Sequence, residues 1–260
     1  MDTNALPIIF EDEFLLVLNK PSGITVNNSE TTAAGATVQD SMEKYLKIQQ
    51  PVANTQDTEL SDEERDTAAF YQRAGIAHRI DKETSGILLV AKTPAVFIAL
   101  LKEFRERTVK KTYVALAHGK VAPTDGEINV PVGRLPWNRR SFGVVPGGRE
   151  AKTLYQVKTY YKMTGKKDSE VLSYLELSPE TGRTHQIRVH LKYINHPIFA
   201  DFLYAGRKIQ RDDRKILSRV FLHAYSISFI HPATNQQVTF NAPIPEELQK
   251  VMDSLDILEI

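Results

Sequence analysis

The stretch HRIDKETSGILLVAKT, residues 78–93, joins a charged half to an apolar half. Its apolar run, residues 86–91, is short and ends at Lys92 and Thr93, a pattern typical of a strand buried on both faces. The mostly charged or hydroxylic residues from 78 to 85 would then lie at the entrance of that strand. A carboxylate held at the mouth of a rigid strand suits a functional site, which makes Asp81 the first candidate. Aspartate is also a common turn residue, and the local sequence alone does not decide between the two roles.

The overall composition indicates a soluble globular protein with room for one large or two small domains. The 260 residues are 42% hydrophobic and 25% charged, and none is cysteine. No apolar run approaches the roughly 20 residues of a membrane span, and the N-terminus does not resemble a secretory signal. Without cysteine, disulfides and thiolate metal sites are excluded. We therefore expect a cytoplasmic protein that makes no contact with membranes.

The net charge of +1 is unevenly distributed along the chain. Residues 54–68 hold six acids and one arginine, whereas basic residues cluster at 102–111, 134–152, 183–192 and 207–219. A polyanion could bind such basic patches, although each could equally be a solvated surface. We predict that residues 50–70 form a flexible acidic insertion, with a short helix from Ser61 on. Its functional alternative is a negatively charged gate beside a nucleic-acid groove.

Periodicity and turn residues predict the remaining elements. Thr93 is expected to cap a helix that has Pro94 at its first position and runs to about Arg107. The other expected elements are strands at 8–10, 14–18, 111–119, 151–162, 169–177, 221–230 and 238–241, and helices at 38–48 and from Glu246 on.

Residues 127–145 form a basic segment around the only tryptophan, Trp137. Prolines and glycines interrupt it, which favours a hairpin or loop, and it carries Arg134, Arg139 and Arg140. Such a segment suits RNA, because bases stack on aromatic rings while phosphates bind arginine. Trp137 could equally be a loop anchor buried under its own segment.

A second polar segment, SPETGRTHQIRVHLKYINHPIFADFLYAG, spans residues 178–206. Thr184 is placed to cap a helix, and Asn195 lies where helices often end in a left-handed residue. His185 and His190 are five residues apart, about 140° around a helix, so they cannot share a metal ion. With no cysteine and no metal-binding spacing, we expect no metal site. Arg183, just before the helix, is the candidate for chemistry.

Together these segments resemble the RluA-type pseudouridine synthases. HRIDKETSGILLVAK resembles the family's active-site motif, LLVLNKPSGITV (residues 15–26) resembles the opening of its catalytic domain, and TGRTHQIRVHL (181–191) and the C-terminal hairpin follow in the family's order. The resemblance implies an α+β fold, with a single catalytic domain over residues 1–260 on a mixed, mainly antiparallel sheet flanked by helices. The chain departs from the pattern at Asn195 and Ala200, where the family usually has glycine, and by one extra residue in Tyr204-Ala205-Gly206.

The same resemblance implies isomerisation of uridine to pseudouridine in rRNA or tRNA, with no cofactor. By position, Asp81 is the catalytic residue, Arg183 pairs with it, and Tyr113 on the 111–119 strand stacks on the uracil. In isolation Tyr113 is more often a residue that packs in a sheet. The residues expected to bind RNA are His78, Arg79, Lys82, Arg134, Arg139, Arg140, His185 and Arg188. Since seven residues precede Ile8, we expect no RNA-binding module in front of the catalytic domain.

Two other classes of function remain open from the sequence. One is an RNA-binding protein that keeps the fold without turnover. The other is a glycosidase-like hydrolase, in which Asp81 and Glu83 would cleave a glycosidic bond and release free uracil. Oligomeric state is unreadable from the sequence, and a monomer is the default expectation.

Overall fold

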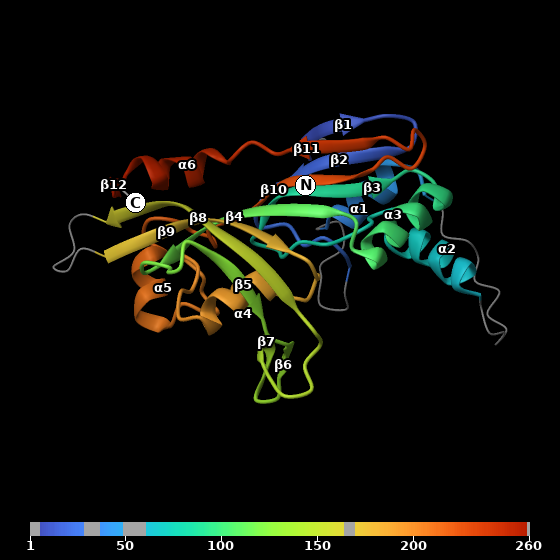
Figure 1. Ribbon diagram of the computed structural model, residues 1–260. Helices are drawn as coiled ribbons and strands as arrows, with labels where there is room; N and C mark the ends of the chain where they lie inside the picture. The colour runs from blue at the N-terminus through green and yellow to red at the C-terminus, as the bar shows by residue number, and fades with distance from the viewer. Residues whose placement is uncertain (1–5, 29–36, 49–60, 164–169, 259–260) are drawn as a thin grey trace. The chain divides into compact units, whose positions relative to one another are not determined.

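The computed structural model describes residues 6–28, 37–48, 61–163 and 170–258 (Figure 1). Contacts divide the chain into two compact units, residues 1–109 with 226–242 and residues 110–225 with 243–260, and each unit is described by itself. Strand β10 (Leu222–Ile230) contributes its first residues to the second unit and the rest to the first. Among the described residues, no helix is long and apolar enough to cross a membrane.

The first unit is built on antiparallel strands covered by helices. Its elements are β1 (Ile8–Glu11), β2 (Leu15–Lys20), α1 (Val38–Tyr45), α2 (Asp62–Gln72), β3 (Ser85–Ala91), α3 (Pro94–Glu106), the second part of β10, and β11 (Gln237–Asn241). Strand β2 lies between β1 and β3, with Leu15 opposite Ala91, and β10 pairs with β11. All seven residues of β3 are buried, which confirms the predicted strand. Phe97 and Leu100 of α3 pack with this strand in the core.

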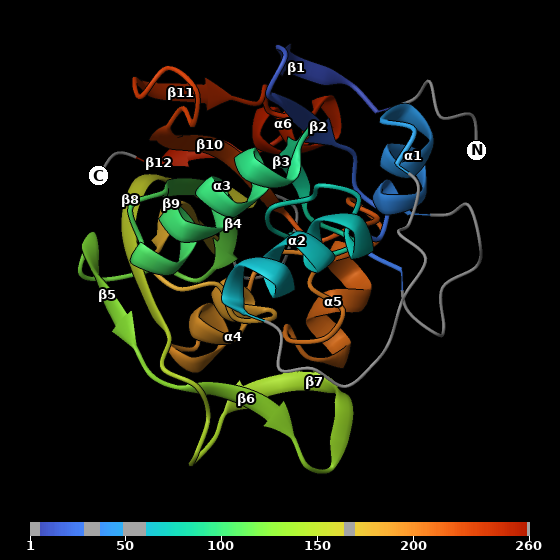
Figure 2. The same cartoon turned by 90° about the vertical axis from the view of Figure 1, so that its right-hand side faces the viewer.

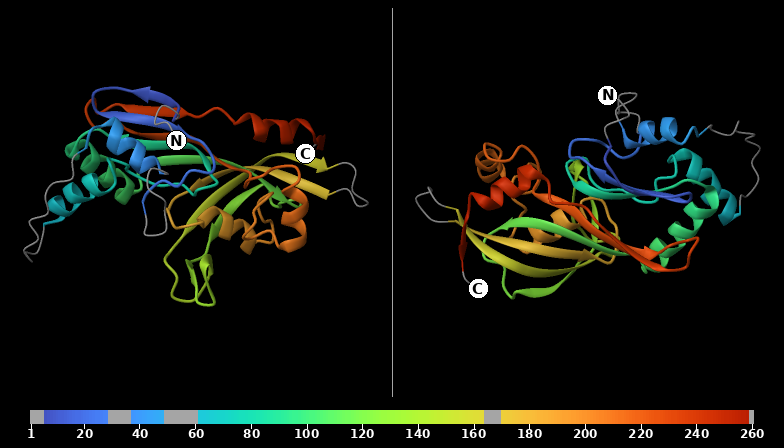
Figure 3. Two further views of the ribbon diagram at one scale, coloured as in Figure 1. Left: turned by 180° about the vertical axis from the view of Figure 1, so that it is seen from behind. Right: turned by 90° about the horizontal axis from the view of Figure 1, so that it is seen from above.

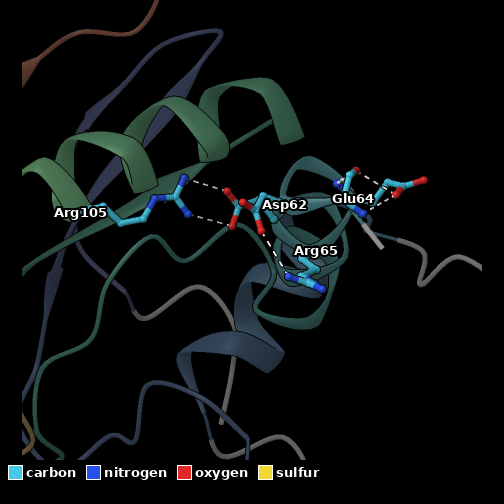
Figure 4. Close-up of polar contacts among 6 residues, drawn as sticks. Asp62, Glu64, Arg65 and Arg105 are labelled. Atoms are coloured by element: carbon cyan, nitrogen blue, oxygen red, sulfur yellow. Dashed lines mark hydrogen bonds and ion pairs between the residues drawn. The ribbon is translucent and has the colours of Figure 1, made fainter. Parts of the chain in front are cut away.

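Helix α2 packs against α3, so the second half of the predicted flexible insertion is an ordered helix. Figure 4 shows the contacts that fix it: Ser61 and Glu64 cap its N-terminus reciprocally, and the Arg105 guanidinium of α3 binds both carboxylate oxygens of Asp66 at 3.1 and 2.8 Å. Phe70 also contacts Phe97, with ring centroids 5.8 Å apart. The predicted helix from Ser61 is thus confirmed, and residues 49–60 of the insertion lie outside the described residues.

The second unit is a twisted antiparallel sheet with helices packed on it. Its elements are β4 (Lys110–His118), β5 (Asp125–Asn129), β6 (Val132–Leu135), β7 (Asn138–Val144), β8 (Lys152–Met163), β9 (Glu170–Pro179), α4 (Gln186–Tyr193), α5 (Arg207–Asp213), the first part of β10, α6 (Glu246–Asp253) and β12 (Asp256–Leu258). Strands β4, β9, β8 and β12 lie side by side in this order, and each neighbouring pair is antiparallel. Strand β5 also pairs with β8. Figures 1 and 3 place α4 and α5 on the same side of this sheet.

The segment around Trp137 is a two-stranded hairpin, β6–β7, that extends away from the rest of the second unit (Figures 1 and 2). Helix α4 begins one residue later than expected. His185 in the left-handed conformation, φ 56°, is its N-cap, and no side chain caps it, so the prediction of a Thr184 cap was wrong. Asn195 is left-handed just after the helix, φ 64°, as expected. Residues 164–168, where the turn between the strands predicted at 151–162 and 169–177 would fall, lie outside the described residues.

Candidate active site

Asp81 lies in the irregular segment that leads into β3, as the sequence predicts. Its side chain is half-buried, and its carbonyl accepts a hydrogen bond from the Thr84 backbone N–H at 3.1 Å, which closes a tight turn before the strand. The exposed side chains of Arg79 and Lys82 lie on either side of it in the sequence. The buried strand behind this turn gives the segment a rigid base.

A fully buried lysine fixes the turn that carries Asp81. The Lys20 ammonium donates to the carbonyls of Pro21 and Ile24, each at 2.9 Å, and to that of Lys82 at 3.2 Å. The Ser22 hydroxyl donates to the Glu83 carbonyl at 2.7 Å, and the Gly23 N–H donates to the Lys82 carbonyl at 2.8 Å. The segment that follows β2 therefore holds the two residues after Asp81 by their backbone. The sequence showed this segment only as a turn, because its long-range partners cannot be read from local pattern.

His78 has an anchoring contact as well. Its Nε2 accepts the Leu89 backbone N–H at 3.1 Å, so the proton of the neutral ring is on Nδ1. The ring also packs on Phe104 of α3, with centroids 5.1 Å apart. These contacts tie the segment before Asp81 to β3 and α3, a role that the prediction of RNA binding at His78 did not anticipate.

Tyr113 lies near the start of β4 in the second unit, half-buried and opposite Leu177 of β9. Lys111 is two residues before it and therefore points to the same face of the strand. Burial lowers the pKa of Lys111 to about 8. An amine that gives up its proton more readily than an ordinary lysine thus lies on the same strand face as the tyrosine that the family motif marks.

Arg183 is half-buried in the loop before α4, and a buried glutamine shapes that loop. The Arg183 N–H donates to Gln186 Oε1 at 3.0 Å, and its Nε donates to the Glu150 carbonyl at 2.9 Å. Gln186 Oε1 also accepts from the Thr181 hydroxyl at 2.7 Å, while Gln186 Nε2 donates to the Lys152 carbonyl at 3.0 Å. Sequence reasoning missed Gln186. The available signal was a glutamine in the first turn of the predicted helix, three residues after Arg183.

The β6–β7 hairpin is joined to the start of α4 by Tyr204. The Tyr204 hydroxyl accepts the Phe142 backbone N–H at 3.0 Å and lies 2.8 Å from Nδ1 of His185. The rings of Phe142, His185 and Tyr204 meet edge to face. His185, two residues after Arg183, therefore supports the hairpin through its contacts with Tyr204 and Phe142. Tyr204 was not singled out from the sequence.

The tryptophan of the β6–β7 hairpin is exposed to solvent. Trp137 is 79% exposed, which excludes the alternative that it is buried under its own segment. The Arg134 guanidinium stacks over the Phe142 ring, 5.1 Å from its centroid. Arg139 and Arg140 lie in β7, and their side chains are outside the described part of the structure.

Arg188 does not fit the prediction that it binds RNA. It is 3% exposed and forms a two-pronged ion pair with the buried Asp201, Nε–Oδ2 2.8 Å and Nη2–Oδ1 2.9 Å. Asp201 also accepts the backbone N–H groups of Leu203 and Tyr204. The Arg188 side chain therefore holds the loop after α4 and is not presented to a ligand, because a buried, paired guanidinium has no free face for a phosphate.

Comparison with known proteins identifies the family of the chain. A sequence model of RNA pseudouridylate synthases matches residues 14–193, which include Asp81, Tyr113 and Arg183. The chain belongs to this family. It is 36% identical over 258 residues to a ribosomal large subunit pseudouridine synthase D of Neisseria meningitidis, and 37% identical over 249 residues to a synthase C of Vibrio vulnificus.

These pseudouridylate synthase relatives are longer than the chain. The alignments cover 96% and 95% of this chain but only 61% of the Neisseria protein and 69% of the Vibrio protein. Two solved human structures share the fold, those of RNA Pseudouridylate Synthase Domain Containing 1 and 4. Their TM-scores are 0.70 and 0.68 at 24% and 21% identity; each alignment covers 99% of this chain, and 91% and 96% of theirs. The expected α+β fold with a mainly antiparallel sheet is thereby confirmed. The predicted pairing of Asp81 with Arg183, which belong to different units, stays a prediction.

Proposed function

We propose that the protein is an RNA pseudouridine synthase that isomerises uridines in ribosomal RNA. The observation that carries this proposal is Asp81, the aspartate of the family motif, in a turn that buried Lys20 fixes at the mouth of β3. The names of the relatives, ribosomal large subunit pseudouridine synthases, favour ribosomal RNA over tRNA as the substrate. Because the chain spans only part of those relatives, their activity is attributed to it as a proposal.

The proposed reaction rearranges the uridine without any net addition or loss of atoms. The N1–C1′ bond breaks, the uracil turns, and C5 bonds to C1′ while the C5 proton is transferred away and N1 is protonated. Carboxylates serve as catalytic nucleophiles, and we assign that role or the proton transfer to Asp81. Arg183 is proposed to supply the opposite charge, and Tyr113 to stack on the uracil with its ring.

Access to the uridine requires that the base leave its stack in the RNA. We propose that Arg79 and Lys82, both exposed beside Asp81, bind the nucleotide around the extruded base. The β6–β7 hairpin, with Arg134, Arg139, Arg140 and exposed Trp137, is proposed to bind the flanking RNA. His185 would act indirectly, because its contacts hold the hairpin through Tyr204.

The family match runs through residues of both compact units, and we propose that the whole chain acts as one catalytic domain. We further propose a cytoplasmic monomer without a cofactor. Size-exclusion chromatography with light scattering tests the oligomeric state, and turnover by protein dialysed against a chelator tests the need for a metal ion.

The deciding experiment measures tritium release from [5-³H]uridine-labelled ribosomal RNA taken from cells that lack the gene. Wild-type protein should release tritium and Asp81→Asn should not, while both should bind the RNA. Mapping of the new pseudouridines then identifies the positions modified. Binding without release by the wild type would contradict the synthase proposal and favour an RNA-binding protein, and free uracil among the products would indicate a hydrolase.

A further inference from the structure

Helix α5 presents a basic face to solvent. Arg207, Lys208 and Arg211 are exposed, and their spacing of three and four residues puts them on one side of the helix. The chain keeps a helical path after α5, because the Leu217 N–H donates to the Asp213 carbonyl at 2.9 Å, so exposed Lys215 continues this side. Four cations thus lie along little more than two turns.

The opposite side of α5 is fixed in the core of the second unit. Asp213 is fully buried, and its carboxylate lies 2.8 Å from Nε2 of His118 and accepts the Ala200 N–H at 3.0 Å. Within residues 207–215 the acid other than buried Asp213 is Asp212, which pairs with Lys215 at 2.9 Å and approaches Arg211 at 3.9 Å. The basic face therefore keeps a clear excess of positive charge on a rigidly held helix.

An aromatic ring lies close to this basic face. Phe202 is 48% exposed, and the Arg214 guanidinium stands over its ring, 5.4 Å from the centroid. Arg214 is itself fixed, because its Nε donates to the Ala200 carbonyl at 2.8 Å. The guanidinium therefore restrains the ring and leaves about half of it open, the arrangement on which an unstacked base can pack.

We propose that the α5 surface, formed by Phe202, Arg207, Lys208, Arg211 and Lys215, is a second RNA-binding surface of the protein, separate from the β6–β7 hairpin. The cations would bind phosphates of the substrate RNA, and Phe202 would stack on an unpaired base. This proposal rests on RNA as the substrate. Ile209 and Ile216 of the same segment are also exposed, but four clustered cations favour RNA over a protein, since a basic stripe matches the phosphate backbone and lysine is depleted in protein interfaces.

The test compares two variants that lose the same number of charges. Arg207→Gln/Lys208→Gln/Arg211→Gln removes three cations of the α5 surface. The control, Lys102→Gln/Lys158→Gln/Lys250→Gln, removes three exposed lysines that pair with glutamates elsewhere. Affinity for deproteinised large-subunit ribosomal RNA is measured for both against salt concentration, after thermal melts confirm that each variant folds.

The α5 variant should bind this RNA on the order of 10-fold more weakly than the control at about 0.1 M salt, and the slope of log K against log salt should fall by about 2, as expected for three lost phosphate contacts. Phe202→Ala should weaken binding roughly 5-fold without changing that slope, because it removes stacking and no charge. Equal affinity and slope for the α5 variant and the control would overturn the proposal and leave the surface to a protein partner.

Failure of the α5 surface and failure of the synthase activity give different results in these experiments. RNA binding by wild-type protein without tritium release would contradict the synthase activity and still allow the α5 surface to be tested. Full tritium release together with unchanged binding by the α5 variant would refute the α5 surface alone.

Discussion

Replacement of Lys20 by methionine should destabilise the protein and disorder the turn that carries Asp81. Methionine fills nearly the same volume as the lysine stem, so the change removes the ammonium and little packing. The ammonium donates to the carbonyls of Pro21, Ile24 and Lys82.

The expected loss of unfolding free energy is about 3 kcal/mol. The Lys82 carbonyl keeps the Gly23 N–H at 2.8 Å, so the main cost falls on the carbonyls of Pro21 and Ile24. A buried acceptor that loses its donor costs about 1–3 kcal/mol, and relief of the buried charge offsets part of the sum. Because the Lys82 carbonyl directly follows Asp81 in the chain, turnover should fall about 100-fold, the scale expected when a reacting group is displaced by about 1 Å.

Urea unfolding followed by circular dichroism gives the stability, and tritium release from labelled RNA gives the turnover. Lys82→Met is the matched control for stability alone, since this exposed lysine lies in the same turn and its loss should change stability by less than about 0.5 kcal/mol. A Lys20→Met protein within about 1 kcal/mol of wild type, with normal turnover, would refute the view that the ammonium holds the turn.

Three further changes test other parts of the structure. Gly75→Ala should destabilise by more than about 2 kcal/mol, because φ is +73° and a Cβ would lie 2.1 Å from the Ala91 carbonyl oxygen; chemical denaturation measures this. Tyr204→Phe should cost about 1–3 kcal/mol and raise the KM for RNA more than it lowers kcat, since the hydroxyl ties the hairpin to α4; steady-state kinetics separate the two. Lys111→Met should be more stable than wild type at pH 7, by up to about 3 kcal/mol, because burial depresses the pKa of this amine to about 8. Wild type should regain this difference as the pH rises from 8 to 10.5, where the unfolded chain binds more protons than the folded one, whereas Lys110→Met, at an exposed position, should show no such gain.

Much of the fold could be predicted because its signals are local. The run of apolar residues in β3 and the Thr93-Pro94 start of α3 appear in the structure where the sequence places them. Strands β5 and β12 were missed, since they are short edge segments whose pairing with β8 depends on distant residues. Arg188 was misassigned for the same reason: an arginine in a basic segment looks like a ligand for phosphate until its partner Asp201, thirteen residues away, is known.

Ala200 shows how far local reasoning reaches at this site. The sequence marked it as an alanine where the family usually has glycine, and the structure gives it a left-handed backbone, φ 60°, which costs an L-residue about 1 kcal/mol. Its N–H donates to the Asp213 carboxylate, and its carbonyl accepts from Arg214 at the end of α5. Because the partners that hold this strained conformation are thirteen and fourteen residues away, the departure from glycine could be seen in the sequence but its compensation could not. The same two residues hold α5 and the ring of Phe202, so the strained turn and the proposed RNA-binding surface depend on one set of contacts.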